Sequence, residues 1–193
     1  MSFNALILAA GFGTRLRPLT NNIPKCLVKI GSKPILEIWL ENLHKAGCES
    51  VLINTHYLAE KVEEFLANKH FKGMRILTSY EPELLGTAGT LIKNKAFFDQ
   101  DFGLMIHGDN FTNTNIKKFV NFHSLTSNSE DALLTMMTFK TDKPESCGII
   151  EINKNGFIEK FYEKDSNFHG YTANSAVYCF DKKLLDYLEI DKE

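Results

Sequence analysis

The first 110 residues alternate between short apolar runs and amphipathic stretches, and this alternation restricts the fold more than any other feature. Apolar runs of strand length occupy 5–10, 50–55, 74–80 and 102–108. Between them, apolar residues recur at helical spacing over 34–47, 58–69 and 87–98. Strands that alternate with helices form right-handed crossovers and a parallel sheet. We therefore predict an α/β fold, with a mixed, mainly parallel sheet covered by helices on both faces.

After about Asn110 the pattern becomes richer in strands. Strand-like runs separated by turns occupy 132–139, 147–153, 156–164 and 174–180. An amphipathic helix is predicted from Lys182 to about Leu188. We find no linker, repeat or low-complexity segment, so we interpret residues 1–193 as a single domain made of two halves, 1–110 and 111–193.

Composition and charge exclude several classes of protein. With 44% hydrophobic and 24% charged residues and a formal net charge of -2, the chain is typical of globular domains and gives no electrostatic case for nucleic acid as a partner. The four cysteines are widely spaced, which favours reduced thiols over a disulfide framework or a zinc site. We find neither a secretory leader nor a membrane span, so we expect a cytoplasmic protein without a membrane partner.

Three polar segments marked by glycines follow predicted strands. They are Gly11–Arg17, Glu81–Gly89 and Gly108–Asn110. In open α/β sheets, ligands bind outside the carboxyl ends of the strands. We therefore expect these three segments to converge on one ligand site. His107, which precedes the third segment, is interpreted as a packed strand residue near that site.

The segment GFGTR is typical of a loop that binds phosphate. Gly11 and Gly13 allow positive φ angles and a close backbone approach, and Arg15 adds a planar, permanently charged group. A simple turn is the plain alternative. A dinucleotide-binding loop is disfavoured because its third glycine falls on Leu16 and because the second strand ends in Asn54 instead of an acid. No G-K-[ST] follows, which excludes a Walker loop.

Two longer stretches carry a resemblance to a known family. LAAGFGTRLRPLT followed by PKCLVKIGSKPIL resembles the signature of the sugar-1-phosphate nucleotidyltransferases, G-x-G-T-R-L-x-P-L-T and then P-K-x-L. Further matches follow in order along the whole chain: EPELLGTAGTL, IHGDN, CGIIEIN, FIEKFYEKD and NSAVY. The resemblance is closest to the mannose-1-phosphate guanylyltransferase-like branch. It implies the Rossmann-like fold of nucleotide-diphospho-sugar transferases and an enzyme that joins a nucleoside triphosphate to a sugar 1-phosphate, releasing pyrophosphate.

The resemblance also assigns roles to residues of the nucleotide-binding half, 1–110. The catalytic residues it implies are Arg15, Lys25 and Asp109. Asp109 is in addition the implied ligand of a magnesium ion (Mg2+). The nucleotide-binding residues it implies are Ala9, Gly11, Gly13, Thr14, Arg15, Glu83, Gly86 and Thr87.

The chemistry of these residue types agrees with such a reaction. In-line attack on the α-phosphorus needs positioning and charge neutralisation but no covalent nucleophile, and we find no Ser-His-Asp or Cys-His arrangement. Lys25 suits charge neutralisation between phosphates, although a solvated surface lysine is the plain alternative. One carboxylate at Asp109, together with nucleotide phosphates, is enough to hold magnesium; a turn cap is its alternative.

The segment EPELLGTAG is the predicted site of the base. Glu81 and Glu83 can accept the N1–H and N2–H donors of guanine, which favours GTP, and they can equally be solvated. Gly86 allows close approach of the base. Thr87 can also cap the helix that follows.

The second half, 111–193, is by resemblance the sugar-phosphate-binding half, for a mannose- or heptose-like substrate. The residues implied are Gly148, Glu163, Lys164 and Asn174. Glu163 would accept sugar hydroxyls and Lys164 would bind the phosphate. A rival register uses the pair Glu159 and Lys160 instead.

The second half departs from the family pattern at several points. Asp165 stands for a proline, Cys147 for an aromatic residue and Ala176 for the glycine of N-A-G, and the later W-x-D-x-G motif is not found. These departures keep alternatives open: a thymidylyl-, uridylyl- or cytidylyltransferase for another sugar or choline phosphate, or a catalytically silent nucleotide-sugar binder. An NAD-type oxidoreductase is a weaker alternative. The residues do not indicate an oligomeric state, and a homodimer is kept as an expectation.

Overall fold

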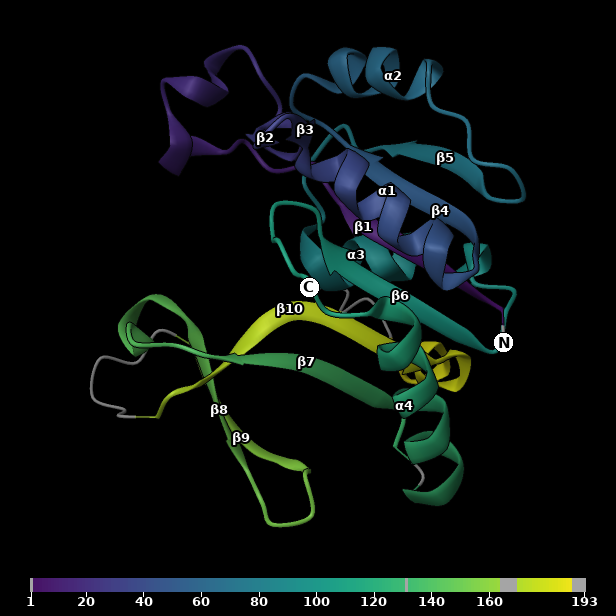
Figure 1. The fold of residues 1–193 in the computed structure, drawn as a ribbon, viewed down its shortest axis with the longest axis vertical. Helices are drawn as coiled ribbons and strands as arrows, with labels where there is room; N and C mark the ends of the chain where they lie inside the picture. The colour runs from purple at the N-terminus through teal and green to yellow at the C-terminus, as the bar shows by residue number, and fades with distance from the viewer. Residues whose placement is uncertain (1, 131, 164–169, 189–193) are drawn as a thin grey trace. The chain divides into compact units, whose positions relative to one another are not determined.

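The structure is a computed structural model that describes residues 2–130, 132–163 and 170–188 (Figure 1). By its internal contacts the chain divides into two compact units. The larger unit contains Met1–Thr135 and Tyr178–Glu193, and the smaller unit contains Met136–Val177. Within the described residues, no helix is long and apolar enough to cross a membrane. The predicted functional division near residue 110 is a separate matter and stays a prediction.

The larger unit is built on a parallel sheet. Its strands are β1 (Phe3–Leu8), β4 (Cys48–Thr55), β5 (Arg75–Tyr80) and β6 (Phe102–His107), in the order β5-β4-β1-β6. All three neighbouring pairs are parallel. The four strands predicted from apolar runs are confirmed. β1, β4 and β6 are buried along nearly their whole length, as is typical of continuous apolar runs, whereas β5 is mostly exposed.

Four α-helices belong to the larger unit. They are α1 (Ile35–Ala46), α2 (Ala59–Ala67), α3 (Gly86–Lys93) and α4 (Ile116–Glu130). The first three were predicted, with α3 ending before a 3-10 turn, η4 (Lys95–Phe97). The sequence analysis did not predict α4, because its Ser, Asn and Thr residues obscure the helical period. The predicted terminal helix is instead a 3-10 helix, η6 (Lys182–Tyr187).

The helices cover both faces of this sheet, as Figure 1 shows for α1 in front of the strands and α3 behind them. On the α3 side, Leu6 and Met105 of the sheet pack with Leu91 of α3 and with Phe98 and Phe180 in one buried cluster. Successive strand residues point to opposite faces, so the buried neighbours of Leu6 face the other layer. The apolar core therefore lies in two layers, one on each face of the sheet, and this packing holds the ends of the strands in place.

The connection from β1 to α1 contains little regular structure. It contains three 3-10 turns, η1 (Thr14–Leu16), η2 (Leu19–Asn21) and η3 (Lys25–Leu27). A short hairpin of β2 (Lys29–Ile30) and β3 (Lys33–Pro34) follows. Pro34 lies just before the first helical residue, Ile35, so the helix predicted over 34–47 begins one residue later. We call residues 11–28 the phosphate loop.

The smaller unit consists mainly of antiparallel strands. β8 (Gly148–Ile152) and β9 (Ile158–Glu163) form a hairpin, and β8 also pairs with β10 (Thr172–Asp181). β7 (Leu134–Lys140) pairs with β10 and is followed by a 3-10 turn, η5 (Pro144–Ser146). β7 and β10 both continue into the residues of the larger unit. The four strand-like runs predicted after Asn110 are thereby confirmed.

Candidate active site

A pocket of about 330 Å³ lies at the carboxyl ends of the strands in the larger unit. The three predicted glycine-marked segments all contribute to it, so their convergence is confirmed. Most of the predicted nucleotide and catalytic residues line it: Ala9, Gly11, Gly13, Thr14, Arg15, Lys25, Gly86, Thr87 and Asp109. The lining also contains residues that we did not assign to the site, among them Asn54, Thr90 and His107.

Gly13 fixes the start of the phosphate loop. Its φ is 64°, and a Cβ at this position would lie 3.0 Å from the Thr20 methyl carbon and 3.2 Å from Lys25 Cβ. The Thr20 hydroxyl donates to the Gly13 carbonyl at 2.7 Å. Gly11 differs from the prediction, because its φ is not positive; nothing lies within 4 Å of a Cβ built there. Gly13 therefore serves the turn, whereas Gly11 leaves room for a ligand.

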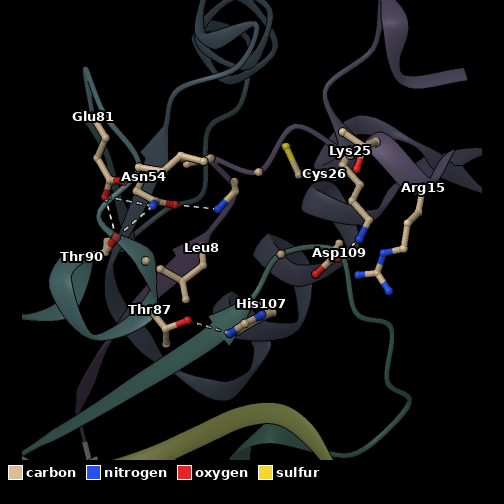
Figure 2. Close-up of a pocket in the computed structure, with 18 residues that line it drawn as sticks. Leu8, Arg15, Lys25, Cys26, Asn54, Glu81, Thr87, Thr90, His107 and Asp109 are labelled. Atoms are coloured by element: carbon tan, nitrogen blue, oxygen red, sulfur yellow. Dashed lines mark hydrogen bonds and ion pairs between the residues drawn. The ribbon is translucent and has the colours of Figure 1, made fainter. Parts of the chain in front are cut away.

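Lys25 and Asp109 form an ion pair at one side of the pocket, with Arg15 beside them (Figure 2). About a quarter of each of the two paired side chains is exposed, 23% for Lys25 and 28% for Asp109. A bound ligand can therefore reach both charges. The Lys25 ammonium and the Asp109 carboxylate thus lie beside Arg15, whose side chain is exposed.

The backbone around Asp109 is tightly held. The Gly108 N–H donates to the Leu8 carbonyl at 2.9 Å, and a Cβ at Gly108 would lie 2.8 Å from an Ile7 side-chain carbon. On the other side, the buried indole of Trp39 donates to the Asn110 carbonyl at 2.8 Å. Only glycine fits against β1 here, and Asp109 is thus carried on a rigid strand end.

Cys26 lines the pocket next to Lys25 but is not a nucleophile. Burial raises the pKa of its thiol to about 12, with the Asp109 carboxylate adding to the rise. A thiol nucleophile must be deprotonated, and this one stays protonated at neutral pH. The pocket therefore favours chemistry without a covalent protein intermediate, as the sequence predicted.

The opposite side of the pocket contains a buried network of polar groups (Figure 2). The Asn54 carbonyl oxygen accepts from the Ala9 N–H at 2.6 Å, and its amide donates to Glu81 Oε1 at 3.0 Å. The Thr90 hydroxyl also donates to Glu81 Oε1, at 2.6 Å. The Leu85 N–H donates to the other oxygen, Oε2, at 3.3 Å. The network joins the ends of β1, β4 and β5 to α3.

This network changes the assignment of the two glutamates. Glu81 is 1% exposed and lines the pocket, whereas the predicted Glu83 is exposed and does not line it. Asn54 was missed as a site residue; the sequence signal was its place as the polar end of an apolar strand. The N–H of Ala9, another predicted residue, is already bonded to Asn54.

Thr87 and His107 are neighbours in the pocket lining, with Thr87 Oγ1 and His107 Nε2 3.5 Å apart (Figure 2). The predicted capping role of Thr87 is wrong, because Thr87 lies inside α3 and the residue that precedes this helix is Leu85. Burial lowers the pKa of His107, and the nearby Lys25 charge adds to this while Asp109 opposes it. His107 thus presents a neutral imidazole to the pocket in addition to packing on its strand.

The smaller unit brings three of the four predicted sugar residues together. Gly148 pairs with Glu163 across β8 and β9, and Ala173 pairs with Ile149, which puts Asn174 next to Gly148. Directly opposite residues face the same side of a sheet. The fourth residue, Lys164, and Asp165 lie outside the described residues.

Two further residues of the smaller unit bear on the sequence predictions. Lys160, from the rival register, is paired with Glu151 at 3.4 Å, with its pKa raised mainly by that carboxylate. Ala176, which stands for the family glycine, has a φ of 53°. Its conformation is thus one that glycine adopts more readily.

Comparison with known proteins agrees with this geometry. The sequence model of the family "Nucleotidyl transferase" matches residues 4–193. The chain belongs to this family. The resemblance stated from the motifs is confirmed, and enzymes of this family generally use a divalent metal.

Similar curated proteins have related names. The chain is 35% identical over 189 residues to the mannose-1-phosphate guanylyltransferase catalytic subunit beta of Drosophila melanogaster, covering 96% of this chain and 50% of the relative. It is 32% identical over 206 residues to the UTP--glucose-1-phosphate uridylyltransferase of Synechocystis, covering 98% and 52%. The chain thus spans about half the length of the curated relatives it matches.

A solved structure has the same fold. HddC from Yersinia pseudotuberculosis, complexed with GMP-PN, superposes with a TM-score of 0.78 at 26% identity, covering 98% of this chain and 81% of HddC. The predicted fold, a mainly parallel sheet of the nucleotide-diphospho-sugar transferase type with helices on both faces, is confirmed by this likeness and by the strand order.

Proposed function

We propose that this chain is a sugar-1-phosphate nucleotidyltransferase that joins GTP to a mannose- or heptose-like sugar 1-phosphate and releases pyrophosphate. The observation that carries the proposal is the pocket of the larger unit. It combines an open glycine and an exposed arginine with the Lys25–Asp109 ion pair on one side and the buried Glu81 network on the other. One side suits a polyphosphate and the other suits a base.

The reaction needs positioned charges more than reactive side chains. A phosphate oxygen of the sugar 1-phosphate attacks the α-phosphorus of the nucleotide in line, and pyrophosphate leaves with the electron pair of the broken P–O bond. Arg15 binds the departing phosphates, and Lys25 neutralises the charge that develops around the α-phosphorus. Asp109 orients the Lys25 ammonium through their ion pair. The protein therefore contributes electrostatic preorganisation.

The donor set fits a magnesium ion held mostly by substrate. Within the described residues, no three His, Cys, Asp or Glu side chains form a metal cluster. Asp109 offers one hard oxygen ligand at the pocket, and Mg2+ typically takes one or two carboxylates together with substrate phosphates and water. When bound, magnesium would supply positive charge to the phosphates. We propose Asp109 as its protein ligand.

The preference for guanine rests on the similarity to a mannose-1-phosphate guanylyltransferase, and Glu81 is the residue that we propose receives the base. Its Oε2 receives only the 3.3 Å bond from Leu85 N–H among the bonds that the structure describes, so it can accept a further hydrogen bond. Guanine, uracil and thymine each carry a ring N–H that can donate to this oxygen, so Glu81 suits all three bases. The similarity to a uridylyltransferase supports UTP as the second candidate. Glu83 is exposed, so it could contact the base only from the exposed part of its loop.

We propose the row Gly148, Glu163 and Asn174 as the sugar-phosphate residues of the smaller unit, together with Lys164. The Glu163→Gln variant should raise the KM for the sugar phosphate about tenfold, because a hydrogen bond to a charged group is worth about 1.5 kcal/mol or more. The KM for GTP should stay unchanged. A parallel rise in both constants would remove Glu163 from the sugar site.

The test is pyrophosphate release with magnesium. GTP, UTP, dTTP and CTP are each combined with a panel of sugar 1-phosphates, and initial rates are measured. Turnover with GTP and a mannose- or heptose-like sugar supports the proposal, and turnover only with another base supports the second candidate. If no pair reacts while a nucleotide sugar still binds in calorimetry, the chain is a silent binder.

We also propose that the protein works in the cytoplasm. All four cysteines lie in the described part of the chain and none is paired in a disulfide. Burial raises the pKa of Cys26 and of Cys48 to about 12, which protects both thiols. Free, protonated thiols are typical of a reducing compartment.

A further inference from the structure

A short segment outside the pocket is bonded to the back of the phosphate loop. Tyr57, which precedes α2, has its hydroxyl 3.1 Å from the Thr20 carbonyl and 2.9 Å from the Asn21 carbonyl. One turn later, the Lys61 ammonium donates to the Asn22 carbonyl at 2.6 Å. The backbone carbonyls of three successive loop residues, 20–22, are therefore hydrogen-bonded to side chains of this one segment.

The phosphate loop has few other fixed points in this part. Its own backbone bonds are short-range, such as Leu16 N–H to Gly13 and Asn21 N–H to Pro18. Within the described residues, the hydrogen bonds that reach residues 14–24 from beyond the loop come from Tyr57 and Lys61. Arg15 lies in this stretch, between Gly13 and the bonded carbonyls of residues 20–22.

The same segment also contacts the loop before Arg15 and the base side of the pocket. The Phe12 ring packs against the rings of His56 and Tyr57, with centroids 5.3 Å and 5.7 Å apart. His56 Nδ1 donates to the Glu81 carbonyl at 2.7 Å. The segment is thus anchored on the strand end that carries Glu81.

The backbone of this segment is strained. Leu58 has φ 52° and ψ 42°, a left-handed conformation that a bulky residue rarely adopts. It lies between Tyr57 and the first residue of α2, and its carbonyl accepts the Lys61 N–H at 3.0 Å. The turn brings Tyr57 and Lys61 to the same loop. Strain of this kind is kept where the surrounding contacts require it and often marks a functional position.

We propose that Tyr57 and Lys61 are positioning residues, which hold the phosphate loop in the conformation that presents Arg15 and Lys25 to a triphosphate. The inference rests on the proposed function. If the loop leaves this conformation, only a fraction of the molecules is competent to bind, and the apparent affinity falls by that fraction. The bound phosphates then fix the loop, so the step after binding changes little.

The kinetic test separates KM from kcat. Tyr57→Phe and Lys61→Met each remove one bonding group, and each should raise the KM for GTP about fivefold, the equivalent of one ordinary hydrogen bond. The kcat should stay within about twofold. The matched controls are Tyr187→Phe and Lys118→Met, which change an exposed tyrosine and an exposed helix lysine elsewhere. Lower thermal stability with an unchanged KM in both test variants would overturn the inference.

A second readout needs no turnover. Arg15 is exposed and followed by Leu16, so trypsin can cut there once the loop opens, whereas the bond from Arg17 to Pro18 resists trypsin. Cleavage after Arg15 should be about fivefold faster in Tyr57→Phe than in Tyr187→Phe. Equal cleavage rates would overturn the inference.

The kinetic and trypsin experiments also distinguish failure of this inference from failure of the proposed function. If the unchanged protein releases no pyrophosphate with any substrate pair, the proposed function fails. Binding of GTP by calorimetry then replaces KM. A loss of affinity in Tyr57→Phe and Lys61→Met but not in the controls still supports the positioning role, and equal affinities, or no GTP binding by the unchanged protein, overturn it.

Discussion

The two compact units differ in how deeply their strands are buried and in how tightly their strand glycines are packed. In the larger unit, five of the six residues of β6 are buried, and Gly103 in that strand is pressed against buried phenylalanines. In the smaller unit, β9 is exposed along most of its length, and Gly148 on the neighbouring strand is pressed against Phe161, which is 47% exposed. A rigid frame surrounds the nucleotide pocket, whereas the proposed sugar residues lie on strands with much exposed surface. The difference predicts which substitutions affect chemistry, stability or only one substrate.

The largest effect is expected at the ion pair of the larger unit. Lys25→Ala and Asp109→Ala should each lower the rate of pyrophosphate release about a thousandfold, because each removes a charge that acts on the reacting phosphates. Both side chains are partly exposed, so the fold should persist. The rate is compared with that of Lys118→Ala, and circular dichroism checks the fold. Near-normal rates would remove the pair from the active site.

The residues of this pair illustrate what sequence can and cannot predict. Lys25 and Asp109 were assigned through the resemblance of two short motifs to the family pattern, and the structure places both side chains at the pocket. Asn54 and Thr90 carry no such motif. Their role arises because parallel strands bring distant segments to one edge, where a buried Glu81 needs donors. Long-range hydrogen bonds of this kind have no local signature.

The fold predictions also succeeded only where an element has a clear local sequence pattern. The strands β1, β4 and β6 were predictable because burial on both faces makes them largely apolar, whereas β5, at the sheet edge, is mostly exposed. The helix α4 was missed because half-buried helices rich in Ser and Asn show a weak period. The row of Gly148, Glu163 and Asn174 was predicted as a set through the family resemblance, but its place on three adjacent strands depends on register, which a single sequence does not show.

Two crowded glycines, Gly103 of the larger unit and Gly148 of the smaller unit, test the contrast in packing directly. A Cβ at Gly103 would lie 2.8 Å from a ring carbon of Phe98 and 2.6 Å from one of Phe180, and both rings are buried. Gly103→Ala should lower the free energy of unfolding by about 2 kcal/mol, the usual cost of overpacking a core. Urea denaturation measures it.

Gly148→Ala is the matched change in the smaller unit. A Cβ there would lie 2.6 Å from the Phe161 ring tip, which can move into solvent, so stability should change by less than about 0.5 kcal/mol. If the two variants unfold at the same urea concentration, the proposed difference in packing between the units is wrong.

A buried histidine of the larger unit predicts a pH effect. His123 is fully buried, its Nδ1 lies 2.8 Å from the Thr135 hydroxyl and its Nε2 has no partner among the described residues. Burial lowers its pKa, with the Asp181 charge opposing this. The unfolded chain therefore binds a proton more readily than the folded one, and stability is lost as pH falls below about 6.5, the unfolded pKa.

The variant His123→Gln isolates this effect, because the amide does not titrate. Between pH 7.5 and pH 5.5 the unchanged protein should lose about 1 kcal/mol more stability than the variant. Urea midpoints at the two pH values measure the difference. Parallel losses in the two proteins would show that His123 does not supply the acid sensitivity.

A small stabilising effect is expected at Ala176 in the smaller unit. Its φ of 53° strains an alanine by about 1 kcal/mol, and Ala176→Gly should recover roughly half of this after the entropy of the unfolded glycine is included. Ala173→Gly, in the same strand at a buried position without positive φ, should instead destabilise by about 1 kcal/mol. Opposite shifts of the two urea midpoints would show that the chain keeps a glycine-like backbone where the family glycine has been replaced. Shifts in the same direction would mean that the smaller unit relaxes around Ala176, and the strain would then be a feature of Leu58 in the larger unit alone.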